Sequence, residues 1–546
     1  MKRFFTYFSI LIVVLLSSFK QSSEVRNVIV MIADGTSLSS ISATRWYMKY
    51  NEMGDNLHID PYLCGTVLSF GSKRPIPDSA PTMACYMTGI PSEDGNISIY
   101  PRVDPENDFV PLDPARTNQP LATLLEAARI QQGKATGIVV TCEFTHATPA
   151  ACASHHYARG NYAVLAPQMA YNNLDVLIGG GTSLVTNDMK SHLKNNGTTL
   201  IQDDLPSMRN FNGEGKMWAL FGSMSMPYDL DRDHEKIPSL EEMTRKAIKL
   251  LSRNKNGFFL MVEGSKIDWA AHSNDAIGVI TELIAFDKAV GAALEFAKNC
   301  GNTAVIVLAD HGTGGLSVGR NGWSGGSTLK AMFGAVSLFK KTAPGLVEIL
   351  NETPANDVKT VFSKYTNIEL NDRELESILQ SRDYKMNTNP HVEAGLPAPT
   401  LQNNIIRIKN QRTPFGFTTG GHTGEEVFLA VYHPKNDRPT GHITNIQVNE
   451  YLHRIMALPT SLLELSDKLF AKHTDVLAGL NYRIITSDSD FPTLTVTKGK
   501  NTLTVKAFGS VAYLNGKPID LGSVTVYIDR NETFYLPADI VKMTGL

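Results

Sequence analysis

Short runs of consecutive apolar residues recur along the chain and end abruptly at polar or glycine-rich positions. They are Asn27–Ala33, Gly137–Thr141, Asp175–Ile178, Phe258–Val262, Thr303–Ala309 and Val427–Tyr432. Uninterrupted Val, Ile and Leu runs of this length are typical of parallel strands that are buried on both faces of a sheet. The pattern therefore predicts a set of buried parallel strands at these positions.

Helical patterns lie between these runs. Leu121–Ile130 is followed by Gly133, and Asp275–Lys298 repeats apolar residues at about helical spacing. Because strands and helices alternate, the sequence predicts an α/β fold with a helix-covered, mostly parallel central sheet.

Two regions depart from this alternation. Residues 318–418 separate two apolar runs and contain helical stretches at Asp357–Tyr365 and Asp372–Gln380, so we expect an insertion above the sheet. After about residue 478 the sequence changes to short alternating segments with Lys-Gly-Lys-Asn and Asn-Gly turn signals. This change predicts a main domain over 24–475, interrupted by the insertion, and a small β-rich module over 478–546.

The first residues have the pattern of an export signal. Lys2 and Arg3 precede an apolar run, ending near Ser18, that is too short to span a bilayer comfortably. We interpret residues 1–22 as a signal peptide of a periplasmic or secreted protein, with an uncleaved anchor as the alternative. No later segment of the sequence looks transmembrane.

The charge balance and the cysteine content limit which binding partners and which disulfide bonds we expect. The 546 residues include 51 Lys and Arg against 54 Asp and Glu, a formal net charge of −3. This balance does not favour a nucleic-acid partner, so an anionic substrate must be held by a local site. Five cysteines leave at least one thiol unpaired in a monomer, and we expect no fold that depends on disulfides.

Three of the apolar runs are followed by an acid. These acids are Asp34, Glu263 and Asp310. In open α/β sheets, ligands bind beyond the carboxyl ends of the strands. A single acid there is often only a helix cap, but converging carboxylates repel one another unless cations neutralise them. The pattern therefore predicts a metal site.

Histidines accompany these acids. Asp268 and His272 are four residues apart and share one face of a helix, His311 follows Asp310 directly, and His422 lies in a glycine-rich loop. Alone, Asp268 and His272 would also fit an exposed pair, and Asp310-His311 an ordinary turn. His422 alone would fit a histidine that only forms a hydrogen bond. Together, the carboxylates and imidazoles suit zinc with a harder neighbour such as magnesium.

The chain resembles the alkaline phosphatase family over nearly all of residues 27–470. The motifs that carry the resemblance stand in family order: IADG, PDSAPTMACYMTG, THATPA, VEGSKIDWAAH, LADHGTGG and GGHTGEEV. The resemblance implies a homodimeric enzyme that hydrolyses small-molecule phosphate monoesters through a phosphoserine intermediate, with two zinc ions and one magnesium ion.

The resemblance also implies roles for individual residues. The metal ligands would be Asp268, His272 and His422 for one zinc, Asp34, Asp310 and His311 for the second, and Thr148 and Glu263 for magnesium, with Asp34 as a bridge. Ser79 would be the nucleophile, at a predicted helix start where backbone N–H groups favour an anion. Arg159, in HHYARGNY, would hold two phosphate oxygens in a fork.

Three residues near the predicted metals differ among family members. His146 and Trp269 stand where some members have Asp and Lys. If His146 reaches the third ion, that site should favour zinc or cobalt over magnesium; the alternative is that His146 only packs against Trp269. Thr313 stands where some members have a histidine, which leaves open the group that orients Asp268.

Two other functions remain as alternatives. A phosphodiesterase or sulfatase could share the core, but Ser79-Ala-Pro-Thr lacks the arginine of a sulfatase motif, and diesterases generally lack the pair that corresponds to Thr148 and Glu263. A non-catalytic phosphate- or metal-binding protein would be expected to have lost the nucleophile or a ligand.

Overall fold

A ten-stranded sheet forms the core of the computed structural model, which describes residues 24–213, 215–323, 325–382, 400–486 and 491–546. The strand order is β14 (Gly441–Thr444), β2 (Leu63–Leu68), β13 (Val427–Tyr432), β8 (Thr303–Leu308), β1 (Asn27–Ile32), β7 (Phe258–Glu263), β3 (Ala135–Glu143), β4 (Val176–Gly180), β6 (Lys216–Leu220) and β5 (Thr198–Gln202). The predicted α/β fold with a mostly parallel sheet is confirmed.

One strand runs opposite to the prediction. β13 pairs antiparallel with both β8 and β2. Its apolar run reflects burial on both faces, which does not depend on strand direction. The chain leaves β8 at the carboxyl edge of the sheet, passes through the insertion and returns to that same edge, so β13 has to run back across the sheet.

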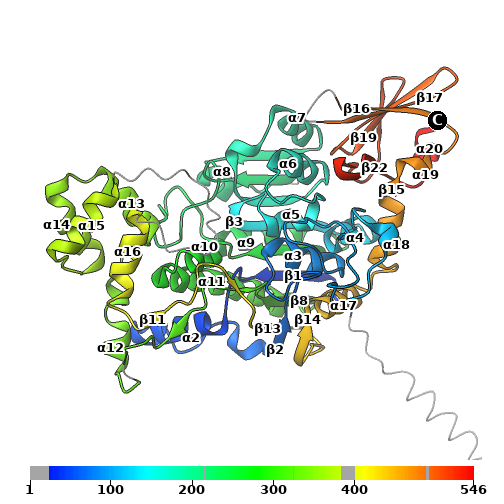
Figure 1. Cartoon of the computed structure of the whole chain (residues 1–546). Helices are drawn as coiled ribbons and strands as arrows, with labels where there is room; N and C mark the ends of the chain where they lie inside the picture. Colours follow the sequence, from blue (N-terminus) through cyan, green and yellow to red (C-terminus); the bar gives the residue numbers. More distant parts are fainter. Residues whose placement is uncertain (1–23, 214, 324, 383–399, 487–490) are drawn as a thin grey trace, which may run out of the picture.

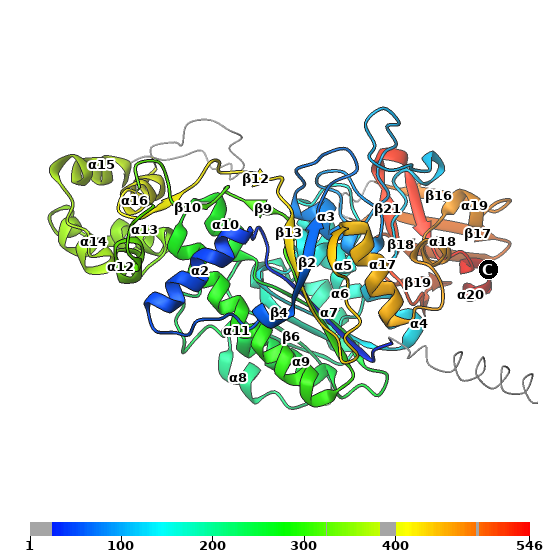
Figure 2. The same ribbon diagram turned by 90° about the horizontal axis from the view of Figure 1, so that it is seen from below.

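Helices cover both faces of the sheet (Figures 1 and 2). One layer contains α2 (Leu38–Tyr50), α9 (Leu240–Leu251) and α11 (Ala276–Cys300), and the other contains α3 (Ser79–Thr88), α4 (Leu124–Gln132), α5 (Ala147–Ala153), α6 (Tyr162–Tyr171) and α17 (Asn445–Met456). All six residues of β1, β7 and β8 are buried, as their apolar sequences predict. Further helices are α7 (Asn187–Asn195), α8 (Leu205–Asn210), α10 (Lys266–His272) and α18 (Leu462–Leu469).

The predicted insertion contains a group of helices at one end of the molecule (Figure 1). They are α12 (Leu329–Phe333), α13 (Ala343–Glu352), α14 (Val358–Thr366), α15 (Asp372–Arg382) and α16 (Leu401–Asn410). Two short antiparallel pairs lie where the insertion leaves and rejoins the core: β9 (Gly312–Thr313) with β12 (His422–Thr423), and β10 (Ser317–Val318) with β11 (Phe415–Gly416). The insertion therefore begins and ends beside the predicted metal ligands.

The C-terminal region contains two small antiparallel sheets at the other end of the molecule (Figure 1). One is a meander of β16 (Asn481–Ile485), β17 (Thr493–Lys498), β18 (Asn501–Lys506), β19 (Val511–Leu514) and β20 (Lys517–Asp520). The other joins β15 (Ala471–Lys472), β22 (Thr533–Leu536) and β21 (Val526–Ile528), beside α19 (His473–Val476) and α20 (Ile540–Thr544). The β-rich character is as predicted, and the domain boundaries stay predictions.

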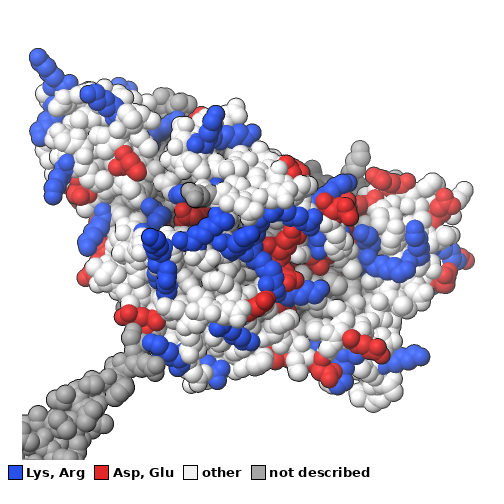
Figure 3. All heavy atoms as spheres, turned by 180° about the vertical axis from the view of Figure 1, so that it is seen from behind, with Lys and Arg blue, Asp and Glu red and all other residues white. Residues whose placement is uncertain are grey.

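Surface features fit the composition. Within the described ranges, no helix has the length and apolarity needed to cross a membrane; the predicted signal peptide lies outside these ranges. Basic and acidic side chains are interspersed on the face in Figure 3. All five cysteines have free thiols, which agrees with a fold that does not depend on disulfides.

Candidate active site

Three neighbouring strands bring the predicted strand-end acids to one edge of the sheet. β1 lies between β7 and β8 and pairs in parallel with both. Glu263 ends β7 and stands in register with Ile32, while Asp34 and Asp310 follow β1 and β8 by two residues. The side chains of all three acids are completely buried. Their convergence in the fold is what the sequence pattern predicted.

Asp268, His272 and His422 form the first predicted ligand group. The Nε2 atom of His272 lies 3.3 Å from Asp268 Oδ2 and 3.1 Å from His422 Nε2. His272 Nδ1 is 2.6 Å from the Gly420 carbonyl oxygen and must donate to it, which leaves the Nε2 lone pair available. Two imidazole nitrogens on one tetrahedral zinc ion lie about 3.3 Å apart, so this arrangement suits zinc.

The second predicted group lies beside Ser79. His311 Nε2 is 3.3 Å from Asp310 Oδ2, 3.7 Å from Asp34 Oδ1 and 3.1 Å from Ser79 Oγ. The rings of His311 and His422 are 4.0 Å apart, so the first and second groups adjoin. The Ser79 hydroxyl therefore lies against a cluster of metal-ligand side chains.

Several oxygen atoms in this cluster are buried and have no hydrogen-bond partner within the described part of the chain. They are Asp34 Oδ2, Asp310 Oδ2, Glu263 Oε1 and Thr148 Oγ1. Buried polar atoms that no protein group satisfies are costly unless an ion or water contacts them. Burial and the neighbouring Asp310 raise the pKa of Asp34 well above its usual value, and burial raises the pKa of Glu263 to about 7. The residues present therefore fit bound cations.

Asp268 is oriented by a residue whose role the sequence left open. Thr313 Oγ1 donates to Asp268 Oδ1 at 2.7 Å and lies 3.2 Å from His311 Nδ1. Thr313 is in β9, which pairs with the strand of His422. One buried hydroxyl thus contacts a ligand from each predicted zinc group.

We expect Thr313→Ala to weaken metal binding or activity by about 10- to 100-fold, the usual cost of removing a group that supports a metal ligand. The loss would follow from the missing hydrogen bond to Asp268. Zinc content after graded chelation, together with kcat/KM, would measure it. Thr313→Ser keeps the hydroxyl and should behave like the parent. Equal metal retention in the Ala variant would contradict this role.

Arg159 reaches the cluster from the loop that precedes α6. Its guanidinium is paired with Asp78, the residue directly before Ser79. Asp78 is the N-cap of α3 and accepts the Ser79 backbone N–H at 2.8 Å. Although burial raises the pKa of Asp78, the pairing with Arg159 lowers it overall. Sequence reasoning gave Asp78 no role; an acid directly before a predicted helix start is the signal that could have identified it as a cap.

His146 contacts Arg159 as well as Trp269. Its ring lies 5.7 Å from that of Trp269, and its Nε2 atom is 3.1 Å from Arg159 Nη2. Because arginine only donates, Nε2 must accept, and the neutral ring carries its proton on Nδ1. Burial and Arg159 lower the pKa of His146 to about 4, which keeps the ring neutral. In this tautomer Nε2 is engaged by Arg159, while Nδ1 carries the proton, is buried and has no hydrogen-bond partner among the described residues.

This arrangement predicts the effect of adding a charge at His146. We expect His146→Asp to lower the magnesium concentration needed for half-maximal activation by about tenfold, the scale for one charge about 5 Å from a dication in a water-like dielectric. His146→Asn is the matched control, since it offers a neutral acceptor to Arg159. Magnesium titrations of activity and metal analysis would compare the three proteins. Identical curves would show that His146 does not influence the third site.

Cys142 is a further neighbour of the third ligand group that sequence reasoning did not identify. Its Sγ atom lies 3.6 Å from Glu263 Oε2, and the ligand atoms of Cys142, His146 and Glu263 lie within 4.8 Å of one another. The strand of Cys142, β3, pairs with β7, which ends in Glu263. The apolar run of β3 marked burial but gave no signal for this contact.

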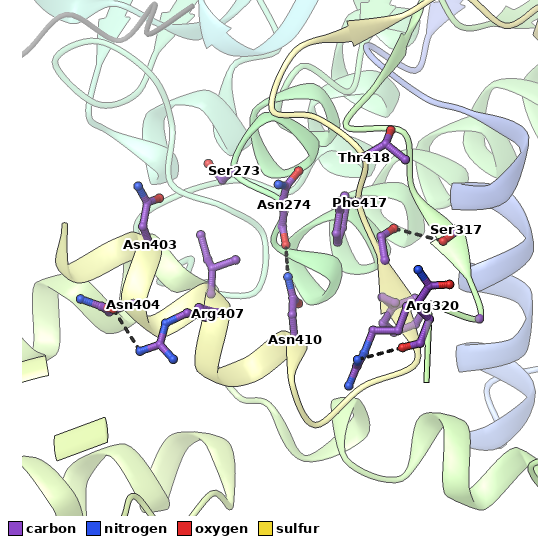
Figure 4. A pocket seen from close by; sticks show the side chains of 15 residues that line it. Ser273, Asn274, Ser317, Arg320, Asn403, Asn404, Arg407, Asn410, Phe417 and Thr418 are labelled. Carbon is purple, nitrogen blue, oxygen red and sulfur yellow. Dashed lines mark hydrogen bonds between the residues drawn. The ribbon is translucent and has the colours of Figure 1, made fainter. Parts of the chain in front are cut away.

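A pocket of about 760 Å³ lies where the insertion meets the core, and its lining includes Ser273 and Asn274, which follow α10 (Figure 4). Its lining is rich in asparagine, and many of the polar groups bond within the protein. Asn410 donates to the Asn274 carbonyl at 2.9 Å, and Arg407 donates to Asn404 at 3.2 Å. The Asn410 bond joins α16 to the segment just after α10, so the pocket lies in the packing of the insertion against the core beside the site.

Comparison with known proteins identifies the family. The sequence model of the alkaline phosphatase family matches residues 25–458. Alkaline phosphatase 3 of Bacillus subtilis is 33% identical over 444 residues, which cover 78% of this chain and 87% of that protein.

Solved structures agree in fold. The cold-active alkaline phosphatase of a psychrophilic Shewanella species superposes with a TM-score of 0.67 at 26% identity, covering 79% of this chain and 99% of that one. A TAB5 alkaline phosphatase mutant in which aspartate replaces a histidine, with Mg bound in its M3 site, gives 0.56 at 24% identity and covers 80% and 99%. On the extent of these matches, this chain belongs to the alkaline phosphatase family of enzymes.

Proposed function

We propose that this enzyme hydrolyses phosphate monoesters to an alcohol and inorganic phosphate through a phosphoserine at Ser79. The observation that carries the proposal is the position of the Ser79 hydroxyl, 3.1 Å from His311 within the cluster of predicted metal ligands. Phosphoryl transfer needs charge stabilisation and alignment of the attacking and leaving oxygens. Both needs are served by the groups around Ser79.

The protein's own residues position the reacting groups. Ser79 begins α3, so the helix N-terminus favours the negative charge of a bound phosphate. Asp78 and His146 hold the Arg159 guanidinium from two sides, which aligns its fork for two phosphate oxygens.

The proposed cofactors are two zinc ions and one magnesium ion. Asp268, His272 and His422 would hold one zinc, and Asp34, Asp310 and His311 the other, while the oxygens of Thr148 and Glu263, with Asp34, favour magnesium. When bound, the ions would activate the serine oxygen and stabilise the leaving oxygen. Because Nε2 of His146 accepts from Arg159, we assign magnesium rather than zinc or cobalt to the third site.

We also propose where the enzyme is located and which oligomer it forms. The charged start and short apolar run of the sequence favour export to the periplasm or the medium. Family resemblance favours a homodimer, which light scattering of the purified protein would test.

The discriminating experiment compares p-nitrophenyl phosphate with bis-p-nitrophenyl phosphate, with zinc and magnesium supplied. We expect rapid hydrolysis of the monoester and little of the diester. Faster diester hydrolysis would favour a phosphodiesterase, p-nitrophenyl sulfate as the better substrate would favour a sulfatase, and phosphate binding without turnover would favour a non-catalytic protein.

A further inference from the structure

The loop that carries Arg159 is fixed on the side facing the core. It connects α5 to α6, and His156 pairs with Ile97 through two backbone hydrogen bonds of 2.7 and 2.9 Å. The Ala158 N–H donates to His156 Nδ1 at 3.0 Å, which closes the turn between His156 and Arg159. A shift of Tyr157 would therefore be transmitted to Arg159 over only two residues.

The C-terminal region holds the other side of this loop. The Tyr157 hydroxyl donates to Asp529 Oδ2 at 2.9 Å. The Arg530 guanidinium carbon lies 3.6 Å from the centre of the Tyr157 ring, and the His156 ring stacks on Tyr157 at 4.3 Å. A cation over an aromatic ring and a hydrogen bond to a carboxylate both favour one position of the tyrosine.

These contacts join parts of the chain that are far apart in sequence. Asp529 and Arg530 lie in the turn between β21 and β22, beyond the residues 25–458 that match the family. The turn is not needed to attach the C-terminal region, because Arg129 also donates to the Gly522 carbonyl at 3.1 Å and the Ala538 N–H donates to the Lys468 carbonyl at 2.9 Å. Both Asp529 and Arg530 are exposed, so their side chains contribute little to the core.

We propose that Asp529 and Arg530 are positioning residues that hold Tyr157 and so fix the Arg159 loop for phosphate binding. This inference rests on the proposed role of Arg159 as the phosphate-binding arginine. It assigns the C-terminal region a part in the affinity of the site for substrate and for the phosphate product, through a contact that lies outside the ligand cluster itself.

The test measures competitive inhibition by inorganic phosphate in Asp529→Ala, Arg530→Ala and the double variant. We expect Ki for phosphate and KM for p-nitrophenyl phosphate to rise together by about three- to tenfold, the scale of a lost cation–π contact or hydrogen bond. The kcat value should change less than twofold, and the thermal midpoint should stay at the parent value. Arg530→Lys should restore part of the affinity, because a cation over the ring is retained.

Two controls make the test specific. Arg483→Ala removes an exposed arginine from the same C-terminal region and should leave Ki unchanged. In an Arg159→Ala background, Arg530→Ala should have no further effect on phosphate binding measured by calorimetry. An unchanged Ki in the double variant, or an undiminished effect without Arg159, would overturn the inference. Absence of monoester hydrolysis in the parent would instead contradict the proposed function, and calorimetry would still report phosphate binding.

Discussion

Ser79→Ala is expected to abolish the phosphorylated enzyme and to lower kcat by about 10³-fold or more, as for removal of other catalytic nucleophiles. The reason is that the Ser79 hydroxyl is the oxygen placed against His311 and Asp34, at 3.1 and 3.5 Å. Rapid quench with labelled substrate at mildly acidic pH should trap phosphoserine in the parent and none in the variant.

Two control measurements show whether the loss of activity in Ser79→Ala comes from the missing nucleophile. Metal content should be unchanged in Ser79→Ala, because the proposed ligands are all still present. Thr88→Val removes another buried hydroxyl from α3, one that donates to the Ala84 carbonyl and accepts from the Ile90 N–H, and should keep full activity. Phosphoserine at another position, or full turnover in Ser79→Ala, would show that a different residue is the nucleophile.

Removal of the metal ions is expected to stop turnover completely, and their return at pH 7 should release more than one proton. Burial lowers the pKa of His272 but Asp268 raises it, to about 9 overall, and burial raises the pKa of Glu263 to about 7. Metal ligands must be deprotonated. Because both pKa values are raised in the metal-free protein, protons compete with the ions increasingly as the pH falls from about 9 to 6.

Calorimetric titration with zinc in buffers of different ionisation enthalpy would count the released protons. The apparent zinc affinity should fall steadily from pH 9 to pH 6, and Ser79→Ala should release the same number of protons as the parent. His272→Ala should release fewer, because it removes the group with the raised pKa. A pH-independent affinity with no proton release would contradict the assignment of His272 as a ligand.

Much of the fold could be predicted because burial leaves a local pattern in the sequence. The runs that became β1, β7 and β8 are apolar except at their ends, and an acid stands where each strand reaches the sheet edge. Parallel strands end at one edge, so Asp34, Glu263 and Asp310 could be placed together before any coordinates. The four-residue spacing of Asp268 and His272 likewise predicted a shared helical face, which α10 provides.

Other features depend on contacts between distant segments. The position of β1 between β7 and β8, and the reversed direction of β13, follow from how the chain returns across the sheet, not from the composition of any strand. A different strand order around β1 would separate the acids, and a different direction of β13 would misplace His422. An apolar run indicates that a strand is buried, but it does not indicate which strands lie beside it.

The sequence by itself determined the type of fold and, through its motifs, the residues proposed to bind metal and attack phosphorus, because periodicity and motifs are local properties. Only the tertiary structure decided that Thr313 supports Asp268, that His146 accepts from Arg159, and that Arg530 contacts Tyr157. Each of these contacts needs two side chains brought within a few ångströms by packing of separate elements. Their geometry arises from the packed core as a whole, which no single segment encodes.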